Sequence, residues 1–299
     1  MHNANNSDFQ IRSVQPEDAT AVVAFLNRVY GNWGTIDHWR WKYVEPPAPF
    51  RYDSILAEHQ GEIIGHYGLL PLEAIVDGQV IPIAQGIDAA VSPDYRRKGV
   101  YTAMAYEILY RAINDGVKFI FAIPGLYALD VNLKHGYQAV DFVSEWTRLI
   151  NFPQALILTI RNFPKYFGGL WAYYQGRSLT SDQTKFLFHV YRSFFFIASF
   201  LTSPNLSWPG RLSPHMEKAI FHPISHFGDH YNDLWDKLSK NTHIGLCKHA
   251  NYLNWRFFSS PSNHYHAYEM QIDNNLVGFF VLKNEGVRCE IAELLILPE

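Results

Sequence analysis

The chain has 299 residues, 48% of them hydrophobic and 18% charged, with a formal net charge of −3. This composition indicates a globular protein with a sizeable core and excludes a disordered or collagen-like chain. The negative charge argues against a general nucleic-acid-binding protein. Two cysteines, Cys247 and Cys289, make no disulfide framework, and the polar N-terminus lacks the apolar core of a signal peptide. We therefore expect a cytoplasmic protein.

Residues 9–148 alternate between strand and helix signals. After a first strand, Pro16 followed by two acidic residues indicates a helix start. Two strands are expected around the turn at Gln60-Gly61, and two more around the hairpin signal Asp77-Gly78. A helix over 99–114, the strand KFIFAI, a short helix and the segment QAVDFVSEWTRL complete the order β-α-β-β-β-α-β-α-β. This order predicts an α/β domain over 8–150 with a mixed, mostly antiparallel sheet.

An aromatic-rich segment over 151–215 follows, and we expect it to be a helical connector. Its most apolar stretch, FLFHVYRSFFFIASFL, contains His189 and Arg192. It therefore falls short of the roughly 20 clean apolar residues that a membrane span needs. No membrane span is expected. Packing against the flanking parts and contact with a membrane surface both stay open.

Residues 216–299 form a third part, which repeats features of the first. HWRWKYVEPPAPFRYDSILAEHQGEIIG is echoed by YLNWRFFSSPSNHYHAYEMQIDNNLVG, which aligns Trp41 with Trp255 and Gly65 with Gly278. Ahead of the second copy, HFGDHYNDLWDKL matches the first helix. The pattern predicts an internal duplication. The second copy stops at IAELLILPE, on a strand before an expected helix, so we expect a C-terminal piece to be absent.

The clearest functional signal is VSPDYRRKGVYTAM, at 91–104. Three cationic side chains, Arg96, Arg97 and Lys98, precede Gly99 and the start of a helix. The free N–H groups and positive end of a helix suit a phosphate, and glycine lets the backbone approach a ligand closely. The pattern predicts an anion site at this turn. A solvated basic turn is the alternative.

This segment resembles the acyl-CoA-binding motif of the GNAT superfamily of N-acyltransferases, Val-x-Pro-x-x-Arg/Gln-x-x-Gly-x-Gly/Ala. Val91, Pro93, Arg96 and Gly99 match, whereas Tyr101 stands where the motif has a small residue. Lys-His-Gly-Tyr at 134–137 resembles the Lys-x-Gly-Phe signature that follows in the family. The resemblance implies a GNAT fold, a partial and degenerate second GNAT-like half, and acetyl-CoA or another acyl-CoA as co-substrate. The implied CoA-binding residues are Val91, Arg96, Arg97, Lys98, Gly99, Val100, Tyr101, Thr102 and Asn132.

The resemblance also implies direct attack of an amine on the thioester, which requires a base. Asp88, three residues before Val91, is the first candidate, and Glu73 and His66 are reserves on neighbouring strands. A buried structural acid or a contact to the substrate ammonium is the alternative for Asp88.

The acid that protonates the leaving thiolate stays unassigned. Asn132 stands where the family commonly has a tyrosine, and an amide cannot donate a proton as a phenol does. Tyr101 and Tyr127 are candidate replacements.

The acceptor implied by the resemblance is a primary amine of a small molecule or an amino sugar. Candidate acceptor contacts are Trp39, Trp41 and Tyr67, and Trp33 lies in the same tryptophan-rich segment. Core packing is the alternative for these tryptophans.

No metal is expected. His222, His226 and His230 are spaced four apart, but Pro223 and Gly228 interrupt the helix that would align them for zinc.

Two other functions remain open. One is a non-catalytic GNAT-like module that binds acyl-CoA, or nothing, and acts as a scaffold, which the departures at Tyr101 and Asn132 favour. The other is an aminoacyl-transferring relative, although such enzymes use charged tRNA and this chain is acidic. The oligomeric state also stays open.

Overall fold

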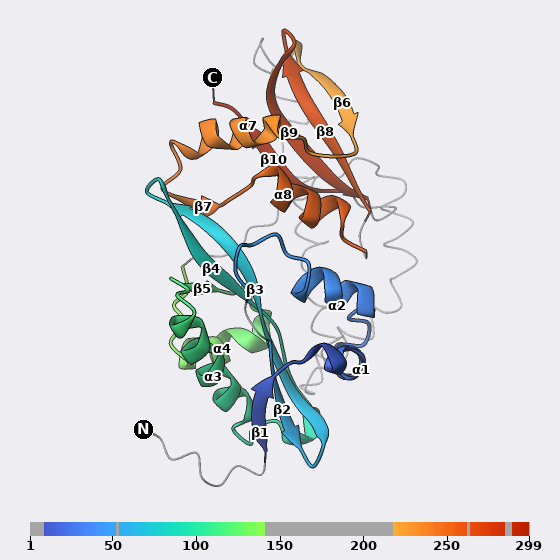
Figure 1. Cartoon of the computed structure of the whole chain (residues 1–299), viewed down its shortest axis with the longest axis vertical. Helices are drawn as coiled ribbons and strands as arrows, with labels where there is room; N and C mark the ends of the chain where they lie inside the picture. Colours follow the sequence, from blue (N-terminus) through green and yellow to red (C-terminus); the bar gives the residue numbers. More distant parts are fainter. Residues whose placement is uncertain (1–8, 52–53, 141–217, 262–263, 285–288, 299) are drawn as a thin grey trace, which may run out of the picture. The chain divides into compact units, whose positions relative to one another are not determined.

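The computed structural model describes residues 9–51, 54–140, 218–261, 264–284 and 289–298 (Figure 1). Met1–Phe142, Ile220–Asn284 and Cys289–Glu299 belong to one compact unit. The connector expected at 151–215 and most of the strand expected at 138–149 lie outside the described residues.

The N-terminal part forms the predicted α/β sheet. Its elements are β1 (Gln10–Ser13), η1 (Pro16–Asp18), α1 (Ala19–Tyr30), α2 (Ile36–Tyr43), β2 (Ile55–His59), β3 (Glu62–Val76), β4 (Gln79–Val91), η2 (Pro93–Tyr95), α3 (Val100–Asn114), β5 (Ile120–Phe121) and α4 (Leu126–Lys134). The strand order is β1-β2-β3-β4-β5. The first four strands pair antiparallel and β5 pairs parallel to β4, which confirms a mixed, mostly antiparallel sheet.

Both expected turns are present. Gln60 and Gly61 have φ values of 51° and 80°, and Asp77 and Gly78 have 47° and 79°. Two successive positive φ values are typical of the tight turns whose twist matches antiparallel strands. These turns fix the register of β2 with β3 and of β3 with β4.

Helices cover both faces of this sheet (Figure 1). On one face, α1 packs Val22 and Leu26 against Leu56 of β2. On the other, α3 packs Met104 and Ile108 against β2 and β3. Since β3 is mostly buried and β4 is partly buried between these layers, buried polar side chains on them need partners within the protein.

The C-terminal part builds a second sheet. Its elements are β6 (Ile220–Ile224), α7 (His230–Ser239), β7 (Ile244–Leu246), α8 (Ala250–Leu253), the π-helical turn η4 (Asn254–Phe258), β8 (Tyr265–Ile272), β9 (Asn275–Asn284) and β10 (Cys289–Ile296). Four strands pair antiparallel in the order β10-β9-β8-β6. β7, which the sequence did not predict, joins the first sheet by pairing with β3 at Ala74–Val76.

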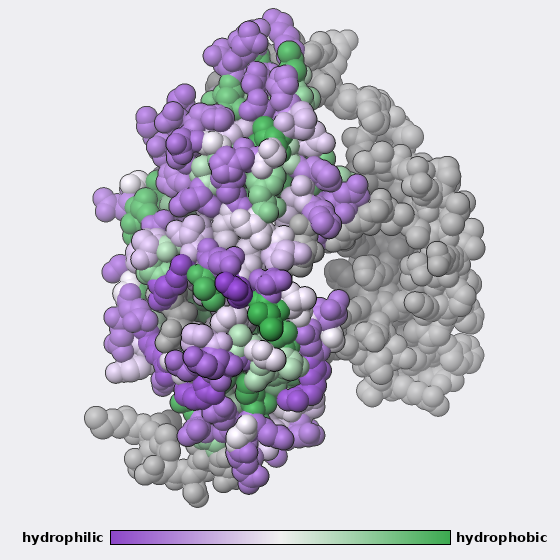
Figure 2. Space-filling view, turned by 45° about the vertical axis from the view of Figure 1, so that its right-hand side comes forward, coloured by the Kyte–Doolittle hydropathy of each residue, from purple (hydrophilic) through white to green (hydrophobic). Residues whose placement is uncertain are grey.

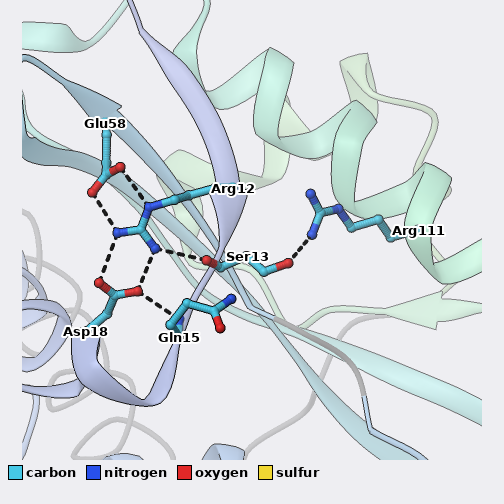
Figure 3. Close-up of polar contacts among 6 residues, drawn as sticks. All are labelled: Arg12, Ser13, Gln15, Asp18, Glu58 and Arg111. Atoms are coloured by element: carbon cyan, nitrogen blue, oxygen red, sulfur yellow. Dashed lines mark hydrogen bonds and ion pairs between the residues drawn. The ribbon is translucent and has the colours of Figure 1, made fainter.

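An arginine clamp ties β1 to its neighbours (Figure 3). The Arg12 guanidinium donates to both oxygens of Glu58 on β2, at 2.8 and 2.7 Å, and to both oxygens of Asp18, at 2.6 and 2.9 Å. The Asp18 carboxylate also accepts from the Gln15 N–H at 2.7 Å. Such bidentate, charge-assisted bonds fix both direction and distance, so the clamp sets the entry of the chain into α1.

Hydrophilic residues cover much of the face shown in Figure 2, with hydrophobic residues in scattered groups. Within the described ranges, we find no helix with the length and apolar character that a membrane crossing requires.

Candidate active site

The predicted anion turn lies between η2 and α3. Gly99 is the N-cap residue of α3 and has a φ of 82°, and Arg97 has a φ of 63°. A side chain at Gly99 would meet nothing within 4 Å, so the backbone is open to solvent there. Arg97 is exposed as well, and the Lys98 ammonium lies 4.9 Å from the centre of the Tyr95 ring. The turn therefore joins a helix N-terminus to exposed cations, as a phosphate site requires.

The first turn of α3 is connected to α4. Val100 is buried and anchors the helix. The Tyr101 hydroxyl donates to Oδ1 of the buried Asn132 at 2.6 Å, and Nε2 of His135 lies 2.9 Å from the Thr102 hydroxyl. The phenol of Tyr101 is thus held beside the residue that stands in place of the family's tyrosine.

Beside this turn, one edge of strand β4 has no neighbouring strand among the described residues, and we call it the open edge. Strand β4 pairs with β5 at Ala84–Ile120 and Gln85–Phe121, and further along β4 the described residues include no strand on that side. On the other side, the ladder passes from Gly68–Ile87 to His66–Ala90, so Asp88 and Ala89 form a bulge. Such bulges redirect side chains next to functional sites. Asp88 also has a φ of 50°, an uncommon conformation for a residue that is not glycine.

The bulge presents the Asp88 carboxylate to α2. The Lys42 ammonium lies 2.9 Å from Oδ2 and 3.2 Å from Oδ1, and the Tyr43 hydroxyl donates to Oδ2 at 2.6 Å. The side chains of Lys42 and Asp88 are 18% and 12% exposed. The sequence did not predict this pair, because 46 residues separate its members.

Burial acts to raise the pKa of Asp88, but the Lys42 ammonium and the Tyr43 hydroxyl outweigh it, and the pKa falls below its usual value. Burial and the charge of Asp88 raise the pKa of Tyr43 well above normal. Asp88 is therefore a stable anion. This state suits it to hold a cation and makes it a weak proton acceptor.

His66 touches the same bulge. Its Nδ1 lies 2.9 Å from the Asp88 carbonyl oxygen, which can only accept, so Nδ1 carries the proton. Nε2 is then an acceptor, and it is buried without a hydrogen-bond partner among the described residues. Burial lowers the pKa of His66, so the ring is neutral near pH 7.

A second polar group faces the β4 strand at Gly86. The hydroxyls of Tyr67 and Tyr137 lie 3.1 Å apart, and a Cβ at Gly86 would lie 3.2 Å from the Tyr67 oxygen. Tyr67 also stacks on Tyr101, with ring centres 5.9 Å apart. Burial raises the pKa of Tyr67 and of Tyr101, so both phenols are protonated at neutral pH.

Other candidate residues lie elsewhere. Glu73 pairs with Pro82 in the ladder, seven residues along β3 from His66, which is about 23 Å in an extended strand. Trp39 and Trp41 are buried at 7% and 5% exposure in hydrophobic clusters. Trp33 lies closer to the Lys42–Asp88 pair, because the Lys42 ammonium is 5.3 Å from the centre of the Trp33 ring.

The three histidines weighed as zinc ligands share no helix. His222 lies on β6, His226 in the following loop and His230 at the start of α7. A search of the described residues finds no group of histidine, cysteine and carboxylate side chains that could hold a metal ion.

A mixed sheet with a bulged fourth strand, a glycine-led helix after it and a fifth strand that pairs over two positions forms an α/β fold of the kind that the resemblance to the GNAT superfamily implied. Residues 10–140 match the family model described as "Acetyltransferase (GNAT) domain". This part of the chain is therefore similar to the GNAT acetyltransferase domain. No curated protein matches the sequence.

Two solved structures extend the likeness over nearly the whole chain. A GCN5-related N-acetyltransferase from Anabaena variabilis matches 97% of this chain with a TM-score of 0.59 and 12% identity. A protein of unknown function from Enterococcus faecalis, described as a probable N-acyltransferase, matches 97% with a TM-score of 0.56 and 10% identity. The match covers 59% of each of those chains. At these identities the likeness concerns the fold alone.

Proposed function

We propose that this protein is an N-acetyltransferase that moves an acetyl group from acetyl-CoA to the primary amine of a small molecule. The observation that carries the proposal is the alignment of three features along β4: the anion turn at Gly99, the open edge, and the bulge at Asp88. In the reaction, one N–C bond forms and the C–S bond breaks. The ammonium loses two protons, of which one goes to the thiolate and one to solvent.

The residues at the turn fit the phosphates of CoA. Gly99 leaves the backbone open, and Arg96 and Arg97 are exposed beside the N–H groups of the first turn of α3. The open edge of β4 offers backbone donors and acceptors to an extended chain that contains amides, as the pantetheine arm does. Backbone N–H groups at the bulge are suited to polarise the thioester carbonyl.

Asp88 serves in this proposal as the holder of the acceptor ammonium. Its ion pair with Lys42 and its lowered pKa argue against direct proton removal. The unpartnered Nε2 of His66, on a neutral ring, is the better base at the bulge. Glu73 is set aside because it lies far along β3.

Tyr101 is our candidate for the acid. The Tyr101 phenol lies 2.6 Å from Asn132, and its raised pKa keeps it protonated. A phenol from α3 thus lies next to Asn132 of α4, which supports a replacement of the family's tyrosine by Tyr101. Tyr101 and Asn132 are the two departures from the family motif, and their contact would account for both.

We further propose that the C-terminal part is a degenerate copy of the GNAT domain. The order β6-β8-β9-β10 parallels β1-β2-β3-β4. The ladder is irregular next to Ala57–Gly65 in one sheet and next to Met270–Gly278 in the other. Shared irregularities of this kind are more specific than shared strand order.

Calorimetric titration with acetyl-CoA tests the cofactor site. We expect micromolar binding by the wild type and its loss in Gly99→Glu, which places a carboxylate at the anion turn. Gly31→Glu is the matched control, because Gly31 also has a positive φ of 91° and a Cβ added there would meet nothing within 4 Å. Absence of wild-type binding would refute the proposal.

Turnover with amines then separates an enzyme from a scaffold. Asp88→Ala should still bind acetyl-CoA and lose acetyl transfer. Binding of acetyl-CoA without transfer to any amine would favour the non-catalytic acyl-CoA-binding module. The free thiols of Cys247 and Cys289 fit the cytoplasmic location that we propose for either function.

A further inference from the structure

In the proposed site, the acceptor would contact the charge pair of Lys42 and Asp88. The Lys42 ammonium lies 2.9 Å from the Asp88 carboxylate, and both side chains are mostly buried. Oδ2 of Asp88 is already occupied by Lys42 and the Tyr43 hydroxyl. Oδ1 has the longer contact to Lys42, at 3.2 Å, and a carboxylate oxygen can accept more than one hydrogen bond. Oδ1 is therefore the atom at which a ligand can join the pair.

Aromatic rings line this pair on the α2 side. The Lys42 ammonium is 5.3 Å from the ring centre of Trp33, and the His38 ring lies edge-on to Trp33 at 4.8 Å. Nε1 of Trp33 is buried and makes no hydrogen bond of normal geometry among the described residues, and a weak hydrogen bond from it contributes to lowering the pKa of Asp88. A donor without a well-formed bond beside a lysine is a place for a ligand acceptor oxygen.

A simple cationic amine fits this arrangement poorly. To reach Asp88 it must share one carboxylate with Lys42, and two cations at short range in a poorly solvated site repel each other. A ligand that also carries a carboxylate removes the conflict, because its anion pairs with Lys42 while its ammonium pairs with Asp88. The four charges then alternate in sign.

We propose that the acceptor is a zwitterionic amine, such as an α-amino acid, held by Lys42 through its carboxylate and by Asp88 through its ammonium. The inference rests on the proposed function and names the substrate class of that same site. Lys42 selects the acceptor, and the indole N–H of Trp33 donates to the same carboxylate. The ammonium is thereby held next to the bulge of β4, where the thioester carbonyl is expected.

A matched set of ligands tests the proposal directly. L-Phenylalanine, phenethylamine and 3-phenylpropionate share one ring and present a zwitterion, a cation and an anion. Binding to the protein saturated with CoA is measured by calorimetry, and acetyl transfer from acetyl-CoA by release of free thiol. We expect the zwitterion to bind about tenfold or more tightly than either singly charged analogue, as the value of a close charge pair implies.

Variants of Lys42 identify its role. Lys42→Met should bring the zwitterion and the cation within about threefold of each other, since one charge contact is lost. Lys42→Arg keeps the charge and should restore the preference. Arg40→Met is the control, because Arg40 is an exposed cation on the same helix.

Two results would overturn the proposal: equal binding of the three ligands by the wild type, or an unchanged preference in Lys42→Met. The wild-type ligand series decides the question even if a variant fails to fold. Failure of the proposed acetyltransferase function is distinguished from failure of this inference by the absence of acetyl-CoA binding. Selective binding of the zwitterion without acetyl transfer would keep Lys42 and Asp88 as its binding residues and refute its role as the acceptor.

Discussion

Trp41 and Trp255 are hydrogen-bonded to each other reciprocally. Nε1 of Trp41 donates to the carbonyl of Trp255 at 2.8 Å, and Nε1 of Trp255 donates to the carbonyl of Trp41 at 2.9 Å. The two rings stack with centres 4.9 Å apart and an interplanar angle of 16°. The two tryptophans that align in the internal repeat are therefore also each other's partners. Equivalent groups that exchange the same contact indicate a local two-fold relation between α2 and η4.

Replacing either tryptophan with phenylalanine should destabilise the protein. Trp255→Phe removes one donor and leaves the buried carbonyl of Trp41 unpaired, which costs about 1–3 kcal/mol in unfolding free energy. Denaturant unfolding measures the effect. Trp39→Phe is the control, because Nε1 of the buried Trp39 has no hydrogen-bond partner in the described structure. An equal loss in both variants would mean that packing, and not the reciprocal bonds, stabilises the contact.

The same pair predicts coupling between the two parts of the chain. Each single variant removes one indole donor and leaves a backbone carbonyl that the second substitution does not remove, so the two hydrogen-bond losses should add. Both substitutions also change the same ring stack, so the double variant Trp41→Phe/Trp255→Phe should cost less than the sum of the single variants by about 0.5–3 kcal/mol through the stacking alone. A double-mutant cycle on unfolding free energies gives this value. Fully additive losses would mean that the stacking of the two rings contributes no coupling.

The Arg12 clamp makes a distinct prediction for acid stability. Hydrogen bonds from Arg12 hold the pKa values of Asp18 and Glu58 below their ordinary values. The stability they confer is therefore complete above about pH 4, where the unfolded carboxyls are ionised, and is lost as the pH falls through the lower folded pKa values. Arg12→Met should cost about 1–2 kcal/mol at pH 7, allowing for partial exposure.

Thermal unfolding of the wild type and Arg12→Met between pH 2 and 7 checks this prediction. The gap in Tm between them should shrink below about pH 4. A constant gap across the range would assign the loss to packing of the arginine stem.

The sequence predicted most of the first sheet because its signals are local. Asp77-Gly78 and Gln60-Gly61 have the conformations that their residue types favour, and Gly99 begins α3 as expected. The alignment of Trp41 with Trp255 also predicted a strand and a turn before Gly278, where β8 and the start of β9 lie, whereas the duplication itself stays a prediction. Local propensity and hydrophobic pattern are sufficient for such elements.

The features that could not be predicted from the sequence depend on contacts between distant segments. β7 is a three-residue strand that exists by pairing with β3, and nothing in IGL marks it as a strand. The partnership of Lys42 with Asp88 requires the bulge in β4 to turn the aspartate toward α2. The burial of Trp39 and Trp41 is likewise set by the fold, and their contact with a ligand stays a prediction. The spacing of a motif identifies residue types, and only the folded chain shows their neighbours.

Tyr101→Phe tests the acid assignment. If the phenol protonates the leaving thiolate, kcat should fall about a hundredfold while affinity for acetyl-CoA is retained, in line with the usual contribution of a general acid. The exposed Tyr110 on the same helix supplies the control variant Tyr110→Phe. A thioester with a more acidic thiol needs less protonation and should show a smaller loss. An equal loss with both thioesters would assign Tyr101 a positioning role through Asn132.

His66 predicts a second pH window, separate from that of the clamp. Burial holds the folded pKa of His66 below its ordinary value of 6.5. Between these two pKa values, the His66 ring is protonated in the unfolded chain and neutral in the folded chain. Stability is therefore complete above about pH 6.5 and decreases as the pH falls toward the folded pKa.

His66→Gln removes this titration and should flatten the dependence of unfolding free energy on pH between about 5 and 7, while the carboxylate window below about pH 4 remains. His38→Gln is the comparison, because burial lowers the pKa of His38 as well and its loss should flatten the curve independently. If His66→Gln leaves the slope between pH 5 and 7 unchanged, the ring is not buried in its neutral form, and its unpartnered Nε2 is no longer a candidate base.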